Sequence, residues 1–93
     1  MTKAIPNGSK MVQEGLFLYE YSKVVSGKTL QFARLYAADG YCFYDKDQPE
    51  NYDEENNLKP ENELTYAQYA VIPYGIDTSK FVCVKVKDGF GII

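Results

Sequence analysis

The densest group of side chains that could do chemistry lies between residues 45 and 63, where carboxylates gather. This segment holds eight carboxylates and two lysines, a net charge of −6, whereas the whole 93-residue chain carries −3. The spacing Asp45-x-Asp47 matches the start of a calcium-binding loop, because Ca²⁺ needs several oxygen ligands at about 2.5 Å. The pattern then fails, since Glu50 stands where such a loop needs glycine and Asn56 where it needs glutamate. We therefore predict no metal site here.

Tyrosines border the same acidic loop, and this combination suits binding to another protein. Carboxylates speed the approach of a basic partner and help to select it, while tyrosine supplies contact area at interfaces. The alternative is a solvated, flexible loop without a partner, since long structureless loops are either functional or disordered. The residues predicted to contact a partner are Tyr44, Asp47, Glu50, Tyr52, Asp53, Glu54, Glu55 and Tyr66.

Arg34 is the single arginine of the chain and forms the second candidate site. A guanidinium offers a planar, two-pronged donor to a carboxylate, so Arg34 and Tyr19 could line a pocket for a small ligand. The alternative is a structural ion pair with some cation–π contact. The expected strand register places Arg34 between Tyr19 and Asp45.

The residue types on which most enzymes rely are missing or sparse. The chain has no histidine, so the commonest general base and the usual catalytic triads are missing. Cys42 and Cys83 are too few for an all-protein zinc site or a disulfide framework. No phosphate-binding loop, dinucleotide fingerprint or nucleophile elbow is present. We predict no catalytic residue, no metal and no cofactor; an enzyme working with paired carboxylates is the remotest alternative.

Strand-forming residues around two glycine turns dominate the first half of the chain. The β-prone runs are 15–25, 28–38 and 41–44. Asp39-Gly40 between two of these runs is a strong signal for a two-residue hairpin loop, and Ser26-Gly27 is a weaker one. The sequence therefore predicts a three-stranded antiparallel meander over about 14–46.

Two-residue loops at both turns fix how these strands pair. The first loop sets Tyr19 opposite Arg34, and the second sets Arg34 opposite Asp45. Aromatic pairs across strands contribute about 0.2–1 kcal/mol each. Both registers gather aromatic residues on one face, which we expect to be the packed band of the fold: Phe17, Tyr21, Phe32, Tyr36 and Phe43.

The second half is less regular. Residues 61–72 suit either a strand or, near 61–70, one short helix with carboxylates in its first turn. Phe81–Lys87 alternates apolar and polar residues and predicts a strand. We expect a flexible lead-in at 1–12, then a single β-rich domain at 13–93 that contains the acidic loop.

These features predict a mainly β fold, or an α+β fold with that one helix, built as a small antiparallel sheet or a partly open barrel. No apolar run reaches the roughly 18 residues of a membrane span. The N-terminus lacks the apolar core of a signal peptide, so we expect a cytoplasmic protein. The mild negative charge disfavours direct binding to nucleic acid or to anionic membranes.

The function expected from the sequence is that of a non-enzymatic protein-interaction module. It would be a small inhibitor or adaptor whose acidic, tyrosine-flanked loop engages a basic partner. A phage- or mobile-element-encoded inhibitor of a nucleic-acid-binding protein fits the composition, although a net charge of −3 is mild for a nucleic-acid mimic. The alternative is a small-ligand-binding domain with Arg34 and Tyr19 in its pocket. The sequence leaves the oligomeric state open.

Overall fold

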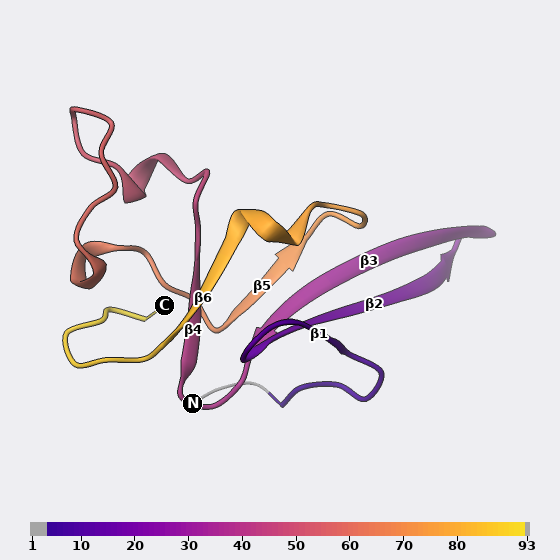
Figure 1. The fold of residues 1–93 in the computed structure, drawn as a ribbon. Helices are drawn as coiled ribbons and strands as arrows, with labels where there is room; N and C mark the ends of the chain where they lie inside the picture. The colour runs from indigo at the N-terminus through magenta and orange to yellow at the C-terminus, as the bar shows by residue number, and fades with distance from the viewer. Residues whose placement is uncertain (1–3, 93) are drawn as a thin grey trace.

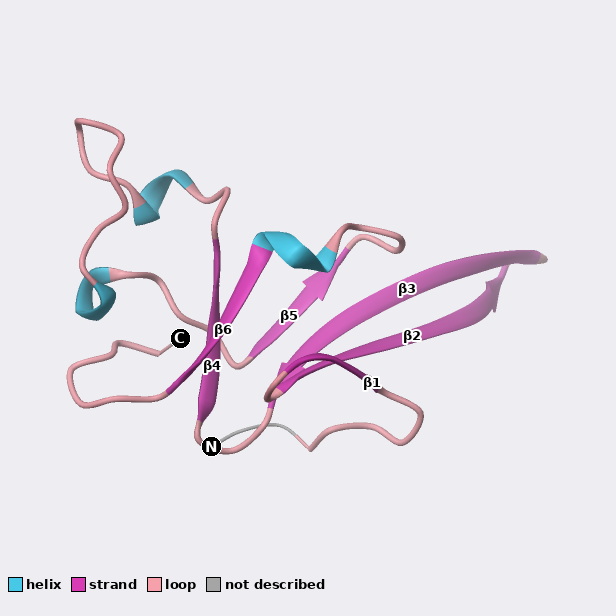
Figure 2. Cartoon of the chain, viewed as in Figure 1, coloured by secondary structure: helices cyan, strands magenta, loops and turns pink. Residues whose placement is uncertain are grey.

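The computed structural model describes residues 4–92, which form six strands in two antiparallel sheets (Figures 1 and 2). The strands are β1 (Lys10–Gln13), β2 (Leu16–Val25), β3 (Lys28–Ala37), β4 (Tyr41–Asp45), β5 (Tyr69–Ile72) and β6 (Phe81–Lys85). Three 3₁₀ turns connect them: η1 (Pro49–Asn51), η2 (Glu61–Glu63) and η3 (Thr78–Lys80). The first sheet has the order β1-β2-β3-β5 and the second pairs β4 with β6. The mainly β prediction is confirmed.

The β2–β3 hairpin follows the predicted register at every position, with Tyr19 opposite Arg34. Ser26 and Gly27 at its tip both have positive φ, 52° and 78°. A two-residue turn of this kind has the same twist as the strands that it joins, so it continues the pairing. The local sequence therefore determines this hairpin.

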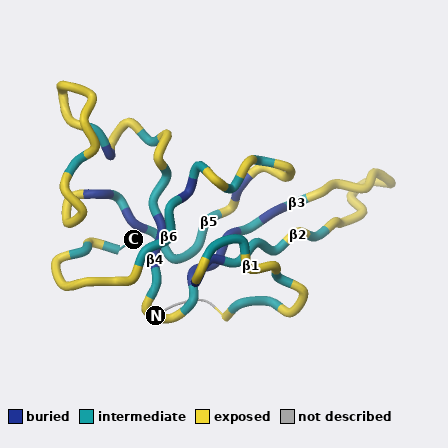
Figure 3. Tube along the Cα trace, viewed as in Figure 1, coloured by how far each residue is buried: buried dark blue, intermediate teal, exposed yellow. Residues whose placement is uncertain are grey.

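The outer half of the hairpin is a ribbon of only two strands. β1 pairs with β2 only as far as Leu18, and β5 pairs with β3 only as far as Ala33. Beyond these positions the ribbon projects from the body (Figure 1), and all of residues 22–31 are exposed (Figure 3).

An N-terminal three-stranded meander is present, but β1, β2 and β3 form it. The predicted pairing of 41–44 with β3 is wrong, because Phe43 lies opposite Cys83 of β6 while Tyr36 lies opposite Tyr69 of β5. At the Asp39-Gly40 turn only the glycine has positive φ, 82°. Turns of this form splay the flanking strands, so the chain leaves the first sheet here.

The predictions for residues 1–12 and 61–72 differ from the structure in where the elements begin and end. β1 begins at Lys10, inside the segment predicted as a lead-in, whose first three residues lie outside the described residues. Residues 61–72 contain a three-residue 3₁₀ turn and then strand β5, so the strand alternative holds for Tyr69–Ile72 and the helix alternative does not. Within residues 4–92 no helix is long and apolar enough to cross a membrane.

A short segment joins the two sheets. Ala67 exchanges two backbone hydrogen bonds with Phe43 of β4, each 2.9 Å long. The next residue, Gln68, accepts a hydrogen bond from the Ala37 N–H of β3 at 2.8 Å. The chain therefore passes from one sheet to the other at this point, and the six strands curl around a common interior.

The Gln13 side chain spans the gap at the opposite side, between β1 and β6. Its Oε1 accepts from the Cys83 N–H at 3.1 Å, and its Nε2 donates to the Phe81 carbonyl. A side-chain amide thus takes the place of a strand-to-strand hydrogen-bond pair. The two sheets form an open barrel. The gap between β1 and β6, which we call the seam, is bridged by the Gln13 side chain.

The core lies between the two sheets. Its buried members are Leu16, Ala33, Leu35, Ala37, Ile72, Phe43 and Phe81. The rings of Phe43 and Phe81 meet edge-on, with centroids 5.7 Å apart. A smaller cluster of Cys42, Leu64 and Tyr66 lies on the other side of β4. The first sheet thus buries its Leu16/Leu35 face, and most of the predicted aromatic band lies on the opposite face.

Candidate functional site

The face of the first sheet that is turned away from the core carries two groups of aromatic rings, with Arg34 between them. We call these rings the aromatic ladder: Tyr19, Tyr21, Phe32, Tyr36 and Tyr69. Tyr19 stacks on Tyr21 with centroids 5.4 Å apart, and Tyr21 stacks on Phe32 at 5.3 Å. Tyr36 and Tyr69 meet at 5.2 Å. None of the five belongs to either core cluster, although Tyr36 is itself buried, with 5% of its surface exposed.

Arg34 lies in the middle of the ladder. Its Cζ is 5.2 Å from the ring centroid of Tyr21 and 6.0 Å from that of Tyr69. A hydrogen bond with the Tyr36 hydroxyl has the largest effect and raises the pKa of the guanidinium. Burial lowers this pKa by less, and the nearby Tyr21 and Tyr69 raise it further. The Nε atom is buried and has no hydrogen-bond partner among the described residues. Arg34 is thus held as a cation by aromatic rings.

The expected contact between Arg34 and Asp45 is wrong. Asp45 lies opposite Phe81 in the second sheet, and its carboxylate forms an ion pair with Lys80 at 3.3 Å. The expected pairing of Arg34 with Tyr19 is confirmed. Both residues lie half-buried on the same sheet face, and neither lines the pocket near β4 and β5 or the one near Tyr74.

Exposed apolar side chains and cations surround the ladder. Met11 and Val71 are 65% and 68% exposed, and Leu30 is 43% exposed on the hairpin. The cations that share this face are Arg34, Lys23 and Lys28, and the strand positions that point to it hold no carboxylate. We call this set of residues, together with the ladder, the outer face. It combines apolar contact area, tyrosine and positive charge.

The acidic loop is a folded segment organised around Asn51. This residue is fully buried, although it lies in a run of polar residues. Its Nδ2 donates to the Asp45 carbonyl at 2.9 Å, and its Oδ1 accepts from the Thr65 N–H at 2.8 Å. Its own carbonyl accepts from the Lys59 N–H at 2.9 Å. Asn51 thus ties both ends of the loop together, a role that no signal in the sequence indicates.

The predicted carboxylates of the loop are exposed: Asp47, Glu50, Asp53, Glu54 and Glu55. Asp53 also has an internal role, because its Oδ1 accepts from the N–H groups of Glu55 and Asn57 at 2.9 Å each. Among the described residues no group of three or more His, Cys, Asp or Glu side chains could hold a metal ion. The loop therefore presents negative charge without forming a cation site.

The tyrosines predicted to assist this loop are used inside the protein. Tyr66 is 1% exposed, stacks on Phe90 at 4.3 Å and donates its hydroxyl to the Glu61 carbonyl at 2.6 Å. Burial raises its pKa to about 12. Tyr44 is half-buried and packs edge-on against Tyr66, and Tyr52 donates its hydroxyl to a backbone carbonyl within the loop. The structure thus removes Tyr66 from the predicted surface and leaves little contact area on the other two.

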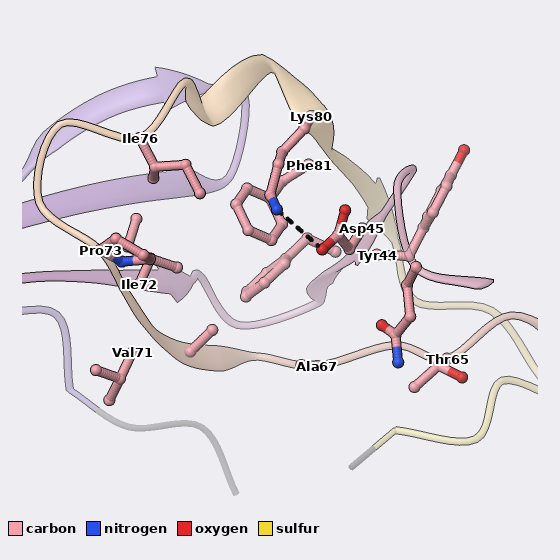
Figure 4. Close-up of a pocket in the computed structure, with 13 residues that line it drawn as sticks. Tyr44, Asp45, Thr65, Ala67, Val71, Ile72, Pro73, Ile76, Lys80 and Phe81 are labelled. Carbon is pink, nitrogen blue, oxygen red and sulfur yellow. Dashed lines mark ion pairs between the residues drawn. The ribbon is translucent and has the colours of Figure 1, made fainter. Parts of the chain in front are cut away.

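A pocket of about 380 Å³ opens where β4 and β5 diverge (Figure 4). Its walls are mostly apolar, and the Lys80–Asp45 ion pair crosses one side, with the lysine Nζ 5.2 Å from the Phe81 ring centroid. The main apolar lining comes from Phe43, Ala67, Ala70, Ile72, Ile76 and Phe81. No pattern in the sequence indicates this pocket, because its two walls come from strands that share no local pattern.

The two cysteines are free thiols on opposite sides of the second sheet. Cys42 is buried in the smaller cluster, while Cys83 is half-buried against the main core. Burial raises the pKa of both thiols, that of Cys83 to about 11. Both are therefore protonated near neutral pH, which is the unreactive form.

No protein-family model, curated protein or solved structure matches the chain.

Proposed function

We propose that this protein is a non-enzymatic protein-interaction module that docks its partner on the outer face. The supporting observation is the exposure of Met11, Leu30 and Val71 around a ladder of tyrosines and Arg34. Tyrosine, arginine and methionine are enriched at interfaces, and tyrosine and arginine are frequent among the residues that contribute most binding energy. Apolar patches with polar borders on small proteins commonly mark interaction sites.

The charge of this face favours an acidic partner surface. Arg34, Lys23 and Lys28 lie on this face, and the strand positions that point to it hold no carboxylate. Neither lysine forms an ion pair with another described residue. Complementary charge speeds association and fixes orientation. The proposal therefore differs from the sequence-based expectation of a basic partner on the acidic loop, whose tyrosines are occupied internally.

The geometry of the rings favours a protein over single-stranded nucleic acid. Proteins that bind single strands offer the free faces of aromatic rings to the bases. Here Tyr21 stacks between Tyr19 and Phe32, with 23° between the ring planes in each pair, so these faces are used within the ladder. Ring edges remain for contact, and these suit a protein surface.

A non-enzymatic role is supported by the state of the nucleophiles. Both thiols have raised pKa values, and the carboxylate of the pocket, Asp45, is already paired with Lys80. The chain has no histidine to act as a base. We place the protein in the cytoplasm, because the two cysteines lie apart as free thiols, as is usual in a reducing compartment.

The test is an affinity pull-down from the native host with three matched variants. The face variant, Leu30→Glu with Val71→Glu, places carboxylates on exposed positions and is expected to lose the partner. The control, Val24→Glu, changes the other side of the same hairpin at a 73% exposed position and is expected to retain it. Loss of the partner by the control as well, or its retention by the face variant, would overturn the proposal.

A third variant tests the acidic loop directly. Neutralising Asp53, Glu54 and Glu55 together leaves the outer face intact, so the partner is expected to remain bound at both low and high salt. If this triple substitution abolishes the complex while the face variant keeps it, the acidic loop is the docking site and the partner is basic.

The second candidate function is binding of a small apolar ligand in the pocket between β4 and β5. Its volume of about 380 Å³ lies within the range of small-molecule sites. Ala70→Leu would fill the pocket from one wall. Compounds that shift the amide resonances of Thr65 and Ile76 in the wild type should leave them unchanged in this variant. Failure of a fragment library to shift either resonance would exclude the candidate.

A further inference from the structure

The edge of β2 is bare along the outer half of the hairpin. The Ala38 N–H donates to the Gly15 carbonyl at 2.8 Å, so odd-numbered residues of β2 hydrogen-bond to β3 and even-numbered ones point away. β1 occupies this edge only as far as Leu18. The backbone N–H and C=O groups of Glu20, Ser22 and Val24 therefore face outward with no partner among the described residues.

The N-terminal segment leaves this edge instead of covering it. Continued pairing of β1 would place residues before Lys10 beside Glu20. A turn diverts them, in which the Ser9 N–H and hydroxyl both donate to the Pro6 carbonyl and Gly8 has a φ of 90°. The exposed edge of β2 thus results from this turn in the N-terminal segment.

The ribbon also exposes apolar side chains on both of its sides. Val24 is 73% exposed on one side and Val25 is 46% exposed on the other. A two-stranded ribbon is marginally stable by itself in water, and three or more strands are usually needed. A further strand on the β2 edge would satisfy the free backbone groups and cover part of both valines.

We propose that a second copy of this chain supplies that strand, so that two β2 edges pair antiparallel about a two-fold axis at Ser22. This register sets Val24 opposite Glu20 of the second copy, and Glu20 opposite Val24 of the second copy. It also sets Lys23 opposite Tyr21 and Val25 opposite Tyr19 of the second copy. No like charges meet, and the two aromatic ladders join into one. The result is a continuous sheet of eight strands.

The neighbouring registers are worse for identifiable reasons. Moving the axis to Lys23 places the two Lys23 side chains directly opposite each other, which destabilises a strand pair. Moving it to Tyr21 places Val24 and Val25 of the second copy, rather than only its Ser26 turn, opposite Leu18 and Phe17, where β1 already pairs. The chain is therefore self-complementary in one register, and this favours a second copy over an unrelated strand. This interface uses the edge of the sheet, so it is independent of the docking proposed for the outer face.

Analytical ultracentrifugation of the full chain, from about 10 µM to about 1 mM, tests the proposal, because a short strand interface is expected to be weak. The wild type should move from monomer to dimer over this range. Ser22→Pro removes an outward N–H that serves no bond among the described residues, so it should fold and remain monomeric. Thr29→Pro, the matched change on the free edge of β3, should dimerise like the wild type.

A cysteine variant provides a second readout that does not depend on affinity. Residues in a hydrogen-bonded antiparallel pair have Cα atoms about 5.5 Å apart, a distance that a disulfide can span. Ser22→Cys should therefore form a disulfide-linked dimer on oxidation, and Thr29→Cys should not. A wild type that stays monomeric throughout, a Ser22→Pro variant that still dimerises, or cross-linking at Thr29→Cys instead would each overturn the proposal.

Discussion

Substitution of Asn51 by alanine should destabilise the protein far more than its place in a polar loop indicates. Within residues 4–92, the change removes the only acceptor of the Thr65 N–H and one of two donors to the Asp45 carbonyl, which keeps the Gln48 N–H. An orphaned buried donor costs about 1–3 kcal/mol, and one lost hydrogen bond about 0.5–1.5 kcal/mol. The expected loss in the free energy of unfolding is therefore about 1.5–4.5 kcal/mol.

Urea denaturation followed by tyrosine fluorescence and circular dichroism measures this loss, since the chain has no tryptophan. The matched control is Asn57→Ala, because Asn57 is exposed in the same loop and uses only its backbone in hydrogen bonds. That control should stay within about 0.5 kcal/mol of the wild type. If Asn51→Ala also stays within that margin, the reasoning that Asn51 organises the loop is refuted.

Three other predictions concern the fold. Gly15→Ala should cost about 2–4 kcal/mol in thermal unfolding, because φ is 81° and a Cβ would lie 2.3 Å from the Tyr41 ring, whereas Gly8→Ala, with open space around it, should cost about 1 kcal/mol. Gln13→Ala should cost about 1–3 kcal/mol and speed hydrogen exchange along β6; unchanged exchange would show that the seam does not depend on it. Tyr66, with a pKa of about 12 when folded against about 10 when unfolded, should lower stability as pH rises from about 10 to about 12, since only the unfolded state ionises there; a slope equally steep in Tyr66→Phe would contradict this.

Local sequence was enough to predict the β2–β3 hairpin. Both strands and the Ser26-Gly27 turn lie within a short stretch, and alternation of aromatic residues fixed the register. The partner of β4 was not predictable in this way. Asp39-Gly40 is a hairpin signal by composition, but the φ of Asp39 selects a turn that splays the strands. The actual partner, β6, lies far along the chain and carries no complementary local pattern.

The candidate sites show the same division. The pairing of Tyr19 with Arg34 followed from register, but which face of the sheet would be covered did not, because Leu16 and Leu35 make the opposite face apolar as well. Only the position of the second sheet decides this. Asn51 could not be found from the sequence, since a buried asparagine in a polar loop is defined by three-dimensional contacts alone.

The Gln13 bridge also bears on the order in which the chain folds. The β2–β3 hairpin closes a two-residue loop, whereas Gln13 and Cys83 are 70 residues apart, so their contact carries the larger cost in chain entropy. We expect the seam to form after the transition state. Gln13→Ala should then raise the unfolding rate and leave the folding rate nearly unchanged in stopped-flow experiments. A slower folding rate in Gln13→Ala would show instead that the seam is already formed in the folding nucleus.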